Sequence, residues 1–87
     1  SMPTLAMERE VKRARVVSRD ELNKRLIEAA SDGNLETVQD VINRGAHINA
    51  VDTSGCTALM KAVARRRKEV VNFLIQAGAD VNRPDAN

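Results

Sequence analysis

The chain has 87 residues, of which 43% are hydrophobic and 30% charged, and its formal net charge is +2. This composition is typical of a folded domain, and so small a net charge does not mark the whole chain as a nucleic-acid binder. Phe73 is the only aromatic residue and Cys56 the only cysteine, which disfavours an aromatic cage or base-stacking platform and excludes an internal disulfide or multi-cysteine zinc site.

Residues 1–17 are predicted to be a tag remnant followed by a helical extension. The first two residues, Ser and Met, have the character of residues left by tag removal. Apolar residues then recur at helical spacing at Met7, Val11 and Ala14, around the basic run at residues 12–15. We expect this stretch to cover the first helix pair or to fray, rather than to serve as a localisation signal.

A first pair of helices is predicted between residues 18 and 45. Ser18 and Glu21 have the spacing of a capping box that begins the first helix, and Gly33 breaks that helix. Asn34 can cap the second helix, and Gly45 ends it in a position that favours a left-handed backbone. The buried faces are predicted from the apolar residues at helical spacing, namely Leu22, Leu26, Ala29, Ala30, Val38, Val41 and Ile42.

A second pair is predicted between residues 55 and 78. Gly55 serves a turn, Thr57 caps the next helix through its hydroxyl, and Gly78 ends the last helix. The residues from Val70 to Ile75 are largely apolar, which predicts a helix covered by its neighbours.

The two pairs are repeats of one pattern with a period of 33 residues. This shift superimposes Leu26 on Leu59, Ala29 on Ala62, Glu36 on Glu69, Val38 on Val71, Ile42 on Ile75, Gly45 on Gly78, Ala46 on Ala79, Asn49 on Asn82 and Asp52 on Asp85. The segment at residues 52–63, which contains the turn and the start of the next helix, and the segment Gly78-Ala79-Asp80-Val81-Asn82 resemble the ankyrin repeat. The resemblance implies an all-α solenoid fragment of paired antiparallel helices with finger-like turns. It also implies a glycine between the paired helices at the position of Arg66, so Arg66 must either adopt a left-handed backbone or force a different turn. It places repeat 1, of N-terminal type, at residues 18–51, repeat 2 at 52–84, and the start of a truncated third repeat at 85–87.

The ankyrin resemblance also implies a protein-binding surface made of the finger turns and the inner face of the first helices. Carried over residue by residue, it comprises Ser31, Asp32, Val51, Thr53, Ser54, Cys56, Ala64 and Arg65, extended by Arg66 and Arg67. The basic run at residues 65–68 stands on the rim of this concave surface, which favours a partner protein with an acidic segment. We therefore predict a non-catalytic protein-interaction module with a basic rim.

Two alternatives remain open: a nucleic-acid or chromatin contact through the basic clusters, and a purely structural role as the cap of a longer array. Self-association or stacking on further repeats is also expected, because stacked repeats bury their apolar faces only against neighbours. The side expected to stay partly uncovered contains Met60, Val63, Val70, Phe73, Leu74 and Ala77.

Catalysis, cofactor binding and metal binding are not expected. His47 has no second histidine to act with, and Cys56 has no histidine placed to activate it. No apolar run approaches the ~18 residues of a membrane span, and the N-terminal residues do not include the apolar core that a secretion signal has. We expect an intracellular protein, cytoplasmic or nuclear.

Overall fold

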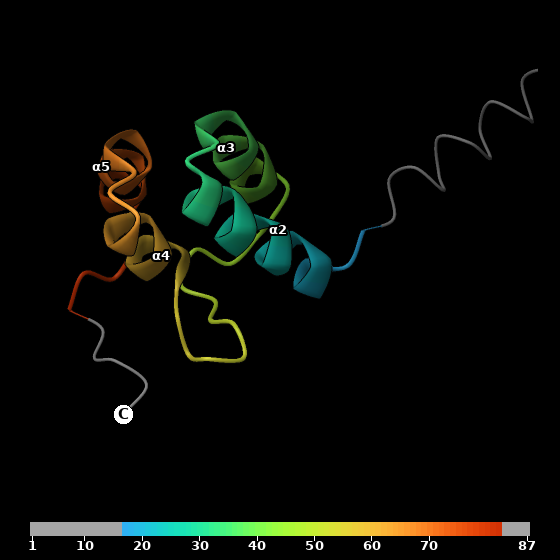
Figure 1. Cartoon of the computed structure of the whole chain (residues 1–87). Coiled ribbons are helices and arrows are strands. Elements are labelled where there is room, and N and C mark those ends of the chain that lie inside the picture. Colours follow the sequence, from blue (N-terminus) through green and yellow to red (C-terminus); the bar gives the residue numbers. More distant parts are fainter. Residues whose placement is uncertain (1–16, 83–87) are drawn as a thin grey trace, which may run out of the picture.

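The computed structural model describes residues 17–82, and these residues form four helices in two layers (Figure 1). Helix α2 spans Arg19–Asp32, α3 spans Leu35–Asn43, α4 spans Ala58–Ala64 and α5 spans Lys68–Gln76. Helix α2 packs against α3 and α4, while α5 packs against α4 and α3. One layer is therefore α2 with α4, and the other is α3 with α5. The expectations for residues 1–16 and 83–87 lie outside the described residues.

The first pair begins and ends where its capping residues predict. The Ser18 hydroxyl accepts a hydrogen bond from the backbone N–H of Glu21 at 3.1 Å. Gly33 has φ +78° and ends α2, and the side chain of Asn34 then accepts a bond from the N–H of Thr37 at 3.1 Å. These contacts satisfy amide groups that a helix end leaves without partners. The predicted caps of this pair are confirmed.

The second pair repeats the arrangement, but its inter-helix turn differs at two positions. Arg66 replaces Gly33, and Arg67 replaces Asn34 as the N-cap of the second helix without making a side-chain cap bond. Thr57 caps α4 by accepting a hydrogen bond from the N–H of Met60 at 3.2 Å. Between α4 and α5, Arg66 has φ +59°, close to the +78° of its counterpart Gly33. The arginine therefore adopts the left-handed backbone and keeps the turn, which costs stability because its Cβ approaches the carbonyl group.

The core is aliphatic and lies between the two layers. Its largest fully buried side chains are Leu26, Leu74, Val38, Val41 and Val70, and small alanines of α2 and α4 are buried beside them. Small residues allow the two helices to approach closely. Two residues expected to stay partly uncovered, Val70 and Leu74, are in fact buried, because α5 packs against both α3 and α4.

Candidate functional site

A finger-like turn at residues 50–57, called the finger below, projects from the helix layers between α3 and α4 (Figure 1). Val51 and Thr57 form an antiparallel bridge at its base. At its tip, the carboxylate of Asp52 accepts hydrogen bonds from the N–H groups of Ser54 at 2.8 Å and Cys56 at 2.9 Å. An aspartate that bonds to the backbone just ahead of it stabilises a turn. The sequence of the finger thus holds its own shape.

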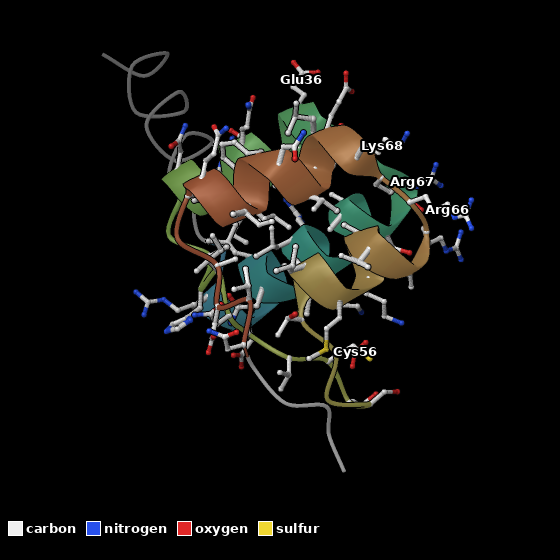
Figure 2. The ribbon with its side chains drawn as sticks, turned by 90° about the vertical axis from the view of Figure 1, so that its left-hand side faces the viewer. Glu36, Cys56, Arg66, Arg67 and Lys68 are labelled. Carbon is white, nitrogen blue, oxygen red and sulfur yellow. The ribbon has the colours of Figure 1, made fainter. Side chains whose placement is uncertain are left out.

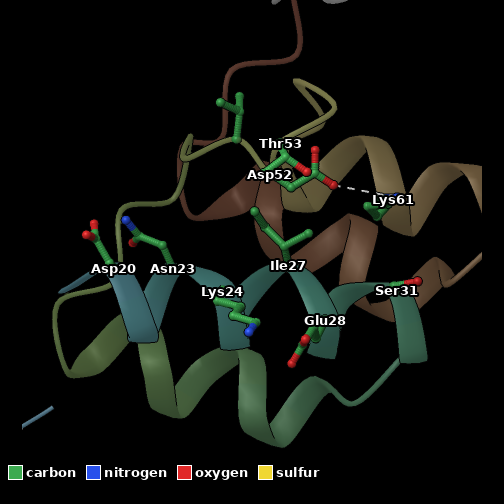
Figure 3. A pocket seen from close by; sticks show the side chains of 10 residues that line it. Asp20, Asn23, Lys24, Ile27, Glu28, Ser31, Asp52, Thr53 and Lys61 are labelled. Atoms are coloured by element: carbon green, nitrogen blue, oxygen red, sulfur yellow. Dashed lines mark ion pairs between the residues drawn. The ribbon is translucent and has the colours of Figure 1, made fainter. Parts of the chain in front are cut away.

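The same carboxylate also faces a cation. The N–H of Cys56 is the main cause that lowers the pKa of Asp52, with further contributions from the N–H of Ser54 and from Lys61. Its Oδ2 lies 3.7 Å from the Nζ of Lys61 on α4 (Figure 3). The pKa of Asp52 is therefore lower in the folded chain than in the unfolded chain. The ionised carboxylate stabilises the fold at pH values above the unfolded pKa, and this stabilisation is lost as the pH falls through the folded pKa.

A groove of about 690 Å³ separates the finger from α2. It is lined by Asp20, Asn23, Lys24, Ile27, Glu28, Ser31, Val51, Asp52, Thr53 and Lys61. The side chain of Ile27 points from α2 toward the finger and gives the groove an apolar floor, while carboxylates and ammonium groups stand around it (Figure 3). An apolar centre within a charged border is the general anatomy of a surface that takes a polypeptide segment.

The groove brings together three of the residues predicted for partner binding: Ser31, Val51 and Thr53. Ser54 and Cys56 belong to the finger but do not line the groove, and Cys56 is half-buried. The other predicted residues, Asp32, Ala64, Arg65, Arg66 and Arg67, lie at the ends of α2 and α4 and in the turn that follows α4. The predicted set therefore occupies two places on the molecule.

Sequence reasoning missed seven lining residues: Asp20, Asn23, Lys24, Ile27, Glu28, Asp52 and Lys61. A signal for most of them was present, because residues 20, 23, 24, 27, 28 and 31 recur at the spacing of one helix face. The family pattern alone does not select that face in the first repeat, since it was carried over only to residues 31 and 32.

The second place is the basic loop, residues 65–68, at the end of α4 remote from Cys56 (Figure 2). Arg65, Arg66 and Lys68 are exposed, whereas Arg67 is half-buried. The Nε of Arg67 donates a hydrogen bond to the backbone carbonyl of Ser31 at 3.0 Å. Among residues 17–82, the three ion pairs involve none of the four cations of this loop. Three of its charges are thus directed to solvent, and one ties the two helix pairs together.

A smaller hollow of about 330 Å³ lies on the C-terminal face of the second pair, lined by Val63, Arg66, Lys68, Val71 and Asn72. Val63 is 56% exposed, whereas its counterpart 33 residues earlier, Ala30, is fully buried. Val71 is half-buried, and its counterpart Val38 is fully buried. The difference arises because the second pair covers the first, while nothing within residues 17–82 covers the second.

No helix in the part of the chain that the structure describes combines the length and the apolar character needed to cross a bilayer. Within the same residues, no group of three or more histidine, cysteine or acidic side chains is placed to hold a metal ion.

Comparison with known proteins gives a consistent result. The family model "Ankyrin repeats (3 copies)" matches residues 10–85. The chain is 43% identical over 60 residues to the human protein Mitochondrial disaggregase, covering 69% of this chain and 8% of that protein. It is 40% identical over 68 residues to Ankyrin repeat and KH domain-containing protein mask-1 of Caenorhabditis elegans, and this match covers 78% of this chain and 3% of that protein. It is 37% identical over 62 residues to the mouse RelA-associated inhibitor, and this match covers 71% of this chain and 8% of that protein. The chain spans less than a tenth of the length of these relatives.

Proposed function

Because the chain belongs to the ankyrin-repeat family, we propose that it is a non-catalytic protein-interaction module that presents a concave surface with a basic rim to a partner protein. Ankyrin repeats generally are protein-interaction modules, and their fold is not itself catalytic. Some relatives are named as enzymes, such as the mouse 2-5A-dependent ribonuclease, but this chain spans only 9% of that protein. Its name describes the whole of that protein and not the part that resembles this chain.

The observation that carries the proposal is the groove between α2 and the finger. Ile27, of which 6% is exposed, forms the apolar floor of the groove, while Lys24 and Glu28 on one side and Lys61 on the other offer charges of both signs. Interfaces gain most of their affinity from a central apolar anchor and much of their specificity from the charges around it. We propose that a partner segment places an apolar side chain over Ile27 and acidic residues toward the basic loop.

The predicted role of the basic rim can be tested with peptides selected against the immobilised full chain from a random library. Replacing both Arg65 and Arg66 with serine is expected to lower the affinity of the chain for the selected peptides about 10-fold, because two positive charges that face an acidic segment are lost. Arg67 is left unchanged because it holds Ser31. Arg44→Ser is the matched control, since Arg44 is an exposed arginine at the far end of α3. Calorimetry gives the affinities, and circular dichroism checks that helix content is kept.

Unchanged affinity in the double variant, or an equal loss in Arg44→Ser, would show that the rim does not contact the partner.

Nucleic-acid contact is the alternative that this loop also allows. It would appear as binding to duplex DNA that falls steeply with added salt and depends little on sequence. The other basic cluster, at residues 12–15, lies outside the described residues. An intracellular location, cytoplasmic or nuclear, remains part of the proposal.

We further propose that residues 18–51 and 52–84 are two repeats and that residues 85–87 begin a third. The side chain of Asn49 accepts a hydrogen bond from the N–H of Asp80 at 2.9 Å and so links the two repeats. Asn82 lies 33 residues after Asn49 and is exposed. Together with the uncovered Val63 and Val71, this residue offers a further repeat an amide side chain and an apolar surface at the positions where repeat 1 contacts repeat 2. An end cap that binds no partner would use the same face.

Self-association through this C-terminal face is the expected behaviour of the isolated chain. Stacked repeats gain stability only by covering their apolar faces, and roughly three or more are usually needed. Sedimentation velocity over a concentration series should show the average mass rising from that of a monomer toward that of a dimer. Val63→Glu should suppress the rise, because Val63 is 56% exposed in this face. Val51→Glu, at a 42% exposed valine in the groove, should leave it intact. A folded monomer at every concentration would contradict the expectation.

A further inference from the structure

At the junction between the two repeats, Arg67 occupies space that is left free because Gly33 has no side chain. The side chain of Arg67 lies across this glycine, and a Cβ added to Gly33 would come within 2.9 Å of the Cδ and 3.2 Å of the Nε of Arg67. The same Nε donates to the carbonyl of Ser31. A cation from repeat 2 thus packs directly on the turn of repeat 1, in space that any other residue at position 33 would occupy.

The next junction cannot be built in this way. The counterpart of Gly33 in repeat 2 is Arg66, which has the same left-handed backbone but carries a long cationic side chain. A further repeat with an arginine in the place of Arg67 would bring that arginine onto the Cβ of Arg66. It would also bring a fifth positive charge to a loop that already has four, at residues 65–68. Both the steric contact and the like charges oppose such a unit.

The positive charge on the uncovered C-terminal face favours an acidic residue, not an arginine, in the repeat that covers it. Arg66 and Lys68 stand at the border of the hollow whose apolar wall is Val63 and Val71, and neither forms an ion pair within residues 17–82. Arg66 also retains its unfavourable backbone, and backbone strain that persists in a fold suggests a use for the residue. We infer that the helix pair covering this face is a further repeat that presents a carboxylate, not a cation, over Arg66. This inference rests on the proposed stacking of further repeats.

The inference makes the order of repeats specific. A repeat that has arginine at the position of Arg67 fits on repeat 1, where Gly33 leaves room for the side chain, but is disfavoured on repeat 2. A repeat that has an acidic residue at this position can pair with Arg66 and Lys68 of repeat 2. Discrimination by a repulsive contact against the wrong neighbour is a general means of specificity.

The test extends the full chain with a copy of its own residues 52–84, inserted after residue 84. Three versions of the copy carry arginine, serine or glutamate at the position that corresponds to Arg67. Each of the three is made twice, once with Arg66 kept in the original chain and once with Arg66→Gly there. With Arg66, the melting temperature is expected to be highest for glutamate and lowest for arginine, with a difference of about 4 °C or more. With Arg66→Gly, the advantage of glutamate over arginine should become smaller, because the steric contact and one of the four positive charges of the loop are removed. In 1 M salt the advantage should shrink, because salt screens the exposed charges.

The outcomes separate this inference from the stacking on which it rests. If all versions melt higher and more cooperatively than the original chain but rank equally, further repeats stack and the carboxylate inference is wrong. If no version gains stability, the copy does not stack and both proposals fail. Extended chains that dimerise through the face, seen by light scattering, would assign the face to a second copy and would also overturn the inference.

Discussion

Replacing Leu74 with alanine is expected to lower the free energy of unfolding by about 3 kcal/mol, the largest effect of any single substitution proposed for this chain. Leu74 is 0% exposed and lies on α5 where this helix packs against α3 and α4. Truncation removes buried methyl groups and leaves a cavity that rigid helix pairs fill only partly. A chain with a small core has little stability to lose, so a large fraction should be unfolded at room temperature. Urea unfolding followed by circular dichroism gives the value.

The adjacent Ile75 is the matched control for this substitution. It has the same number of side-chain carbons and lies on the same helix, but it is 47% exposed. Ile75→Ala should cost less than about 1 kcal/mol, because most of the deleted surface is already in contact with water. Equal losses for the two variants would mean that the two-layer core does not enclose Leu74.

Replacing Gly33 with alanine is expected to cost about 2 kcal/mol. Part of the loss is the left-handed backbone at φ +78°, which alanine adopts unfavourably. The other part is the contact of the new Cβ with Arg67, whose Cδ would lie 2.9 Å away. Arg67 is a flexible side chain and can move away, but the movement weakens its hydrogen bond to Ser31 and so loosens the junction between the repeats. Thermal unfolding and urea unfolding should both report the loss.

The two parts of this loss can be separated with a double-mutant cycle. In an Arg67→Ala background, Gly33→Ala no longer meets the long side chain and should cost only the backbone part. The expected coupling between the two positions is about 1 kcal/mol. Strictly additive effects would show that Arg67 does not pack across Gly33 in solution.

The helices and their ends could be read from the sequence because each depends on residues close to it. Ser18, Asn34 and Thr57 cap amides three residues away, and Gly33 ends its helix by its own backbone freedom. Such local preferences do not depend on the rest of the fold. The 33-residue period then indicated stacked pairs of helices of the ankyrin type, and the family match confirms that family.

The groove and the role of Arg67 could not be predicted in the same way, since each joins segments distant in sequence. Ile27 becomes the floor of a groove only when the finger stands opposite α2. The bond from Arg67 to Ser31 spans 36 residues, and an arginine within a basic run gives no sign that it is half-buried. The sequence also left two alternatives for Arg66, and only the φ of +59° decided between them.

The bond from Arg67 to Ser31 also bears on how the chain folds. It is the hydrogen bond with the widest sequence separation among the side-chain bonds of residues 17–82, and it still reaches back only about one repeat. No stage of folding therefore has to close a loop much longer than one repeat before the next contact can form. Contacts that span no more than about one repeat limit the entropy cost of loop closure, which rises with loop length. Either helix pair can form first and serve as the template on which the other assembles.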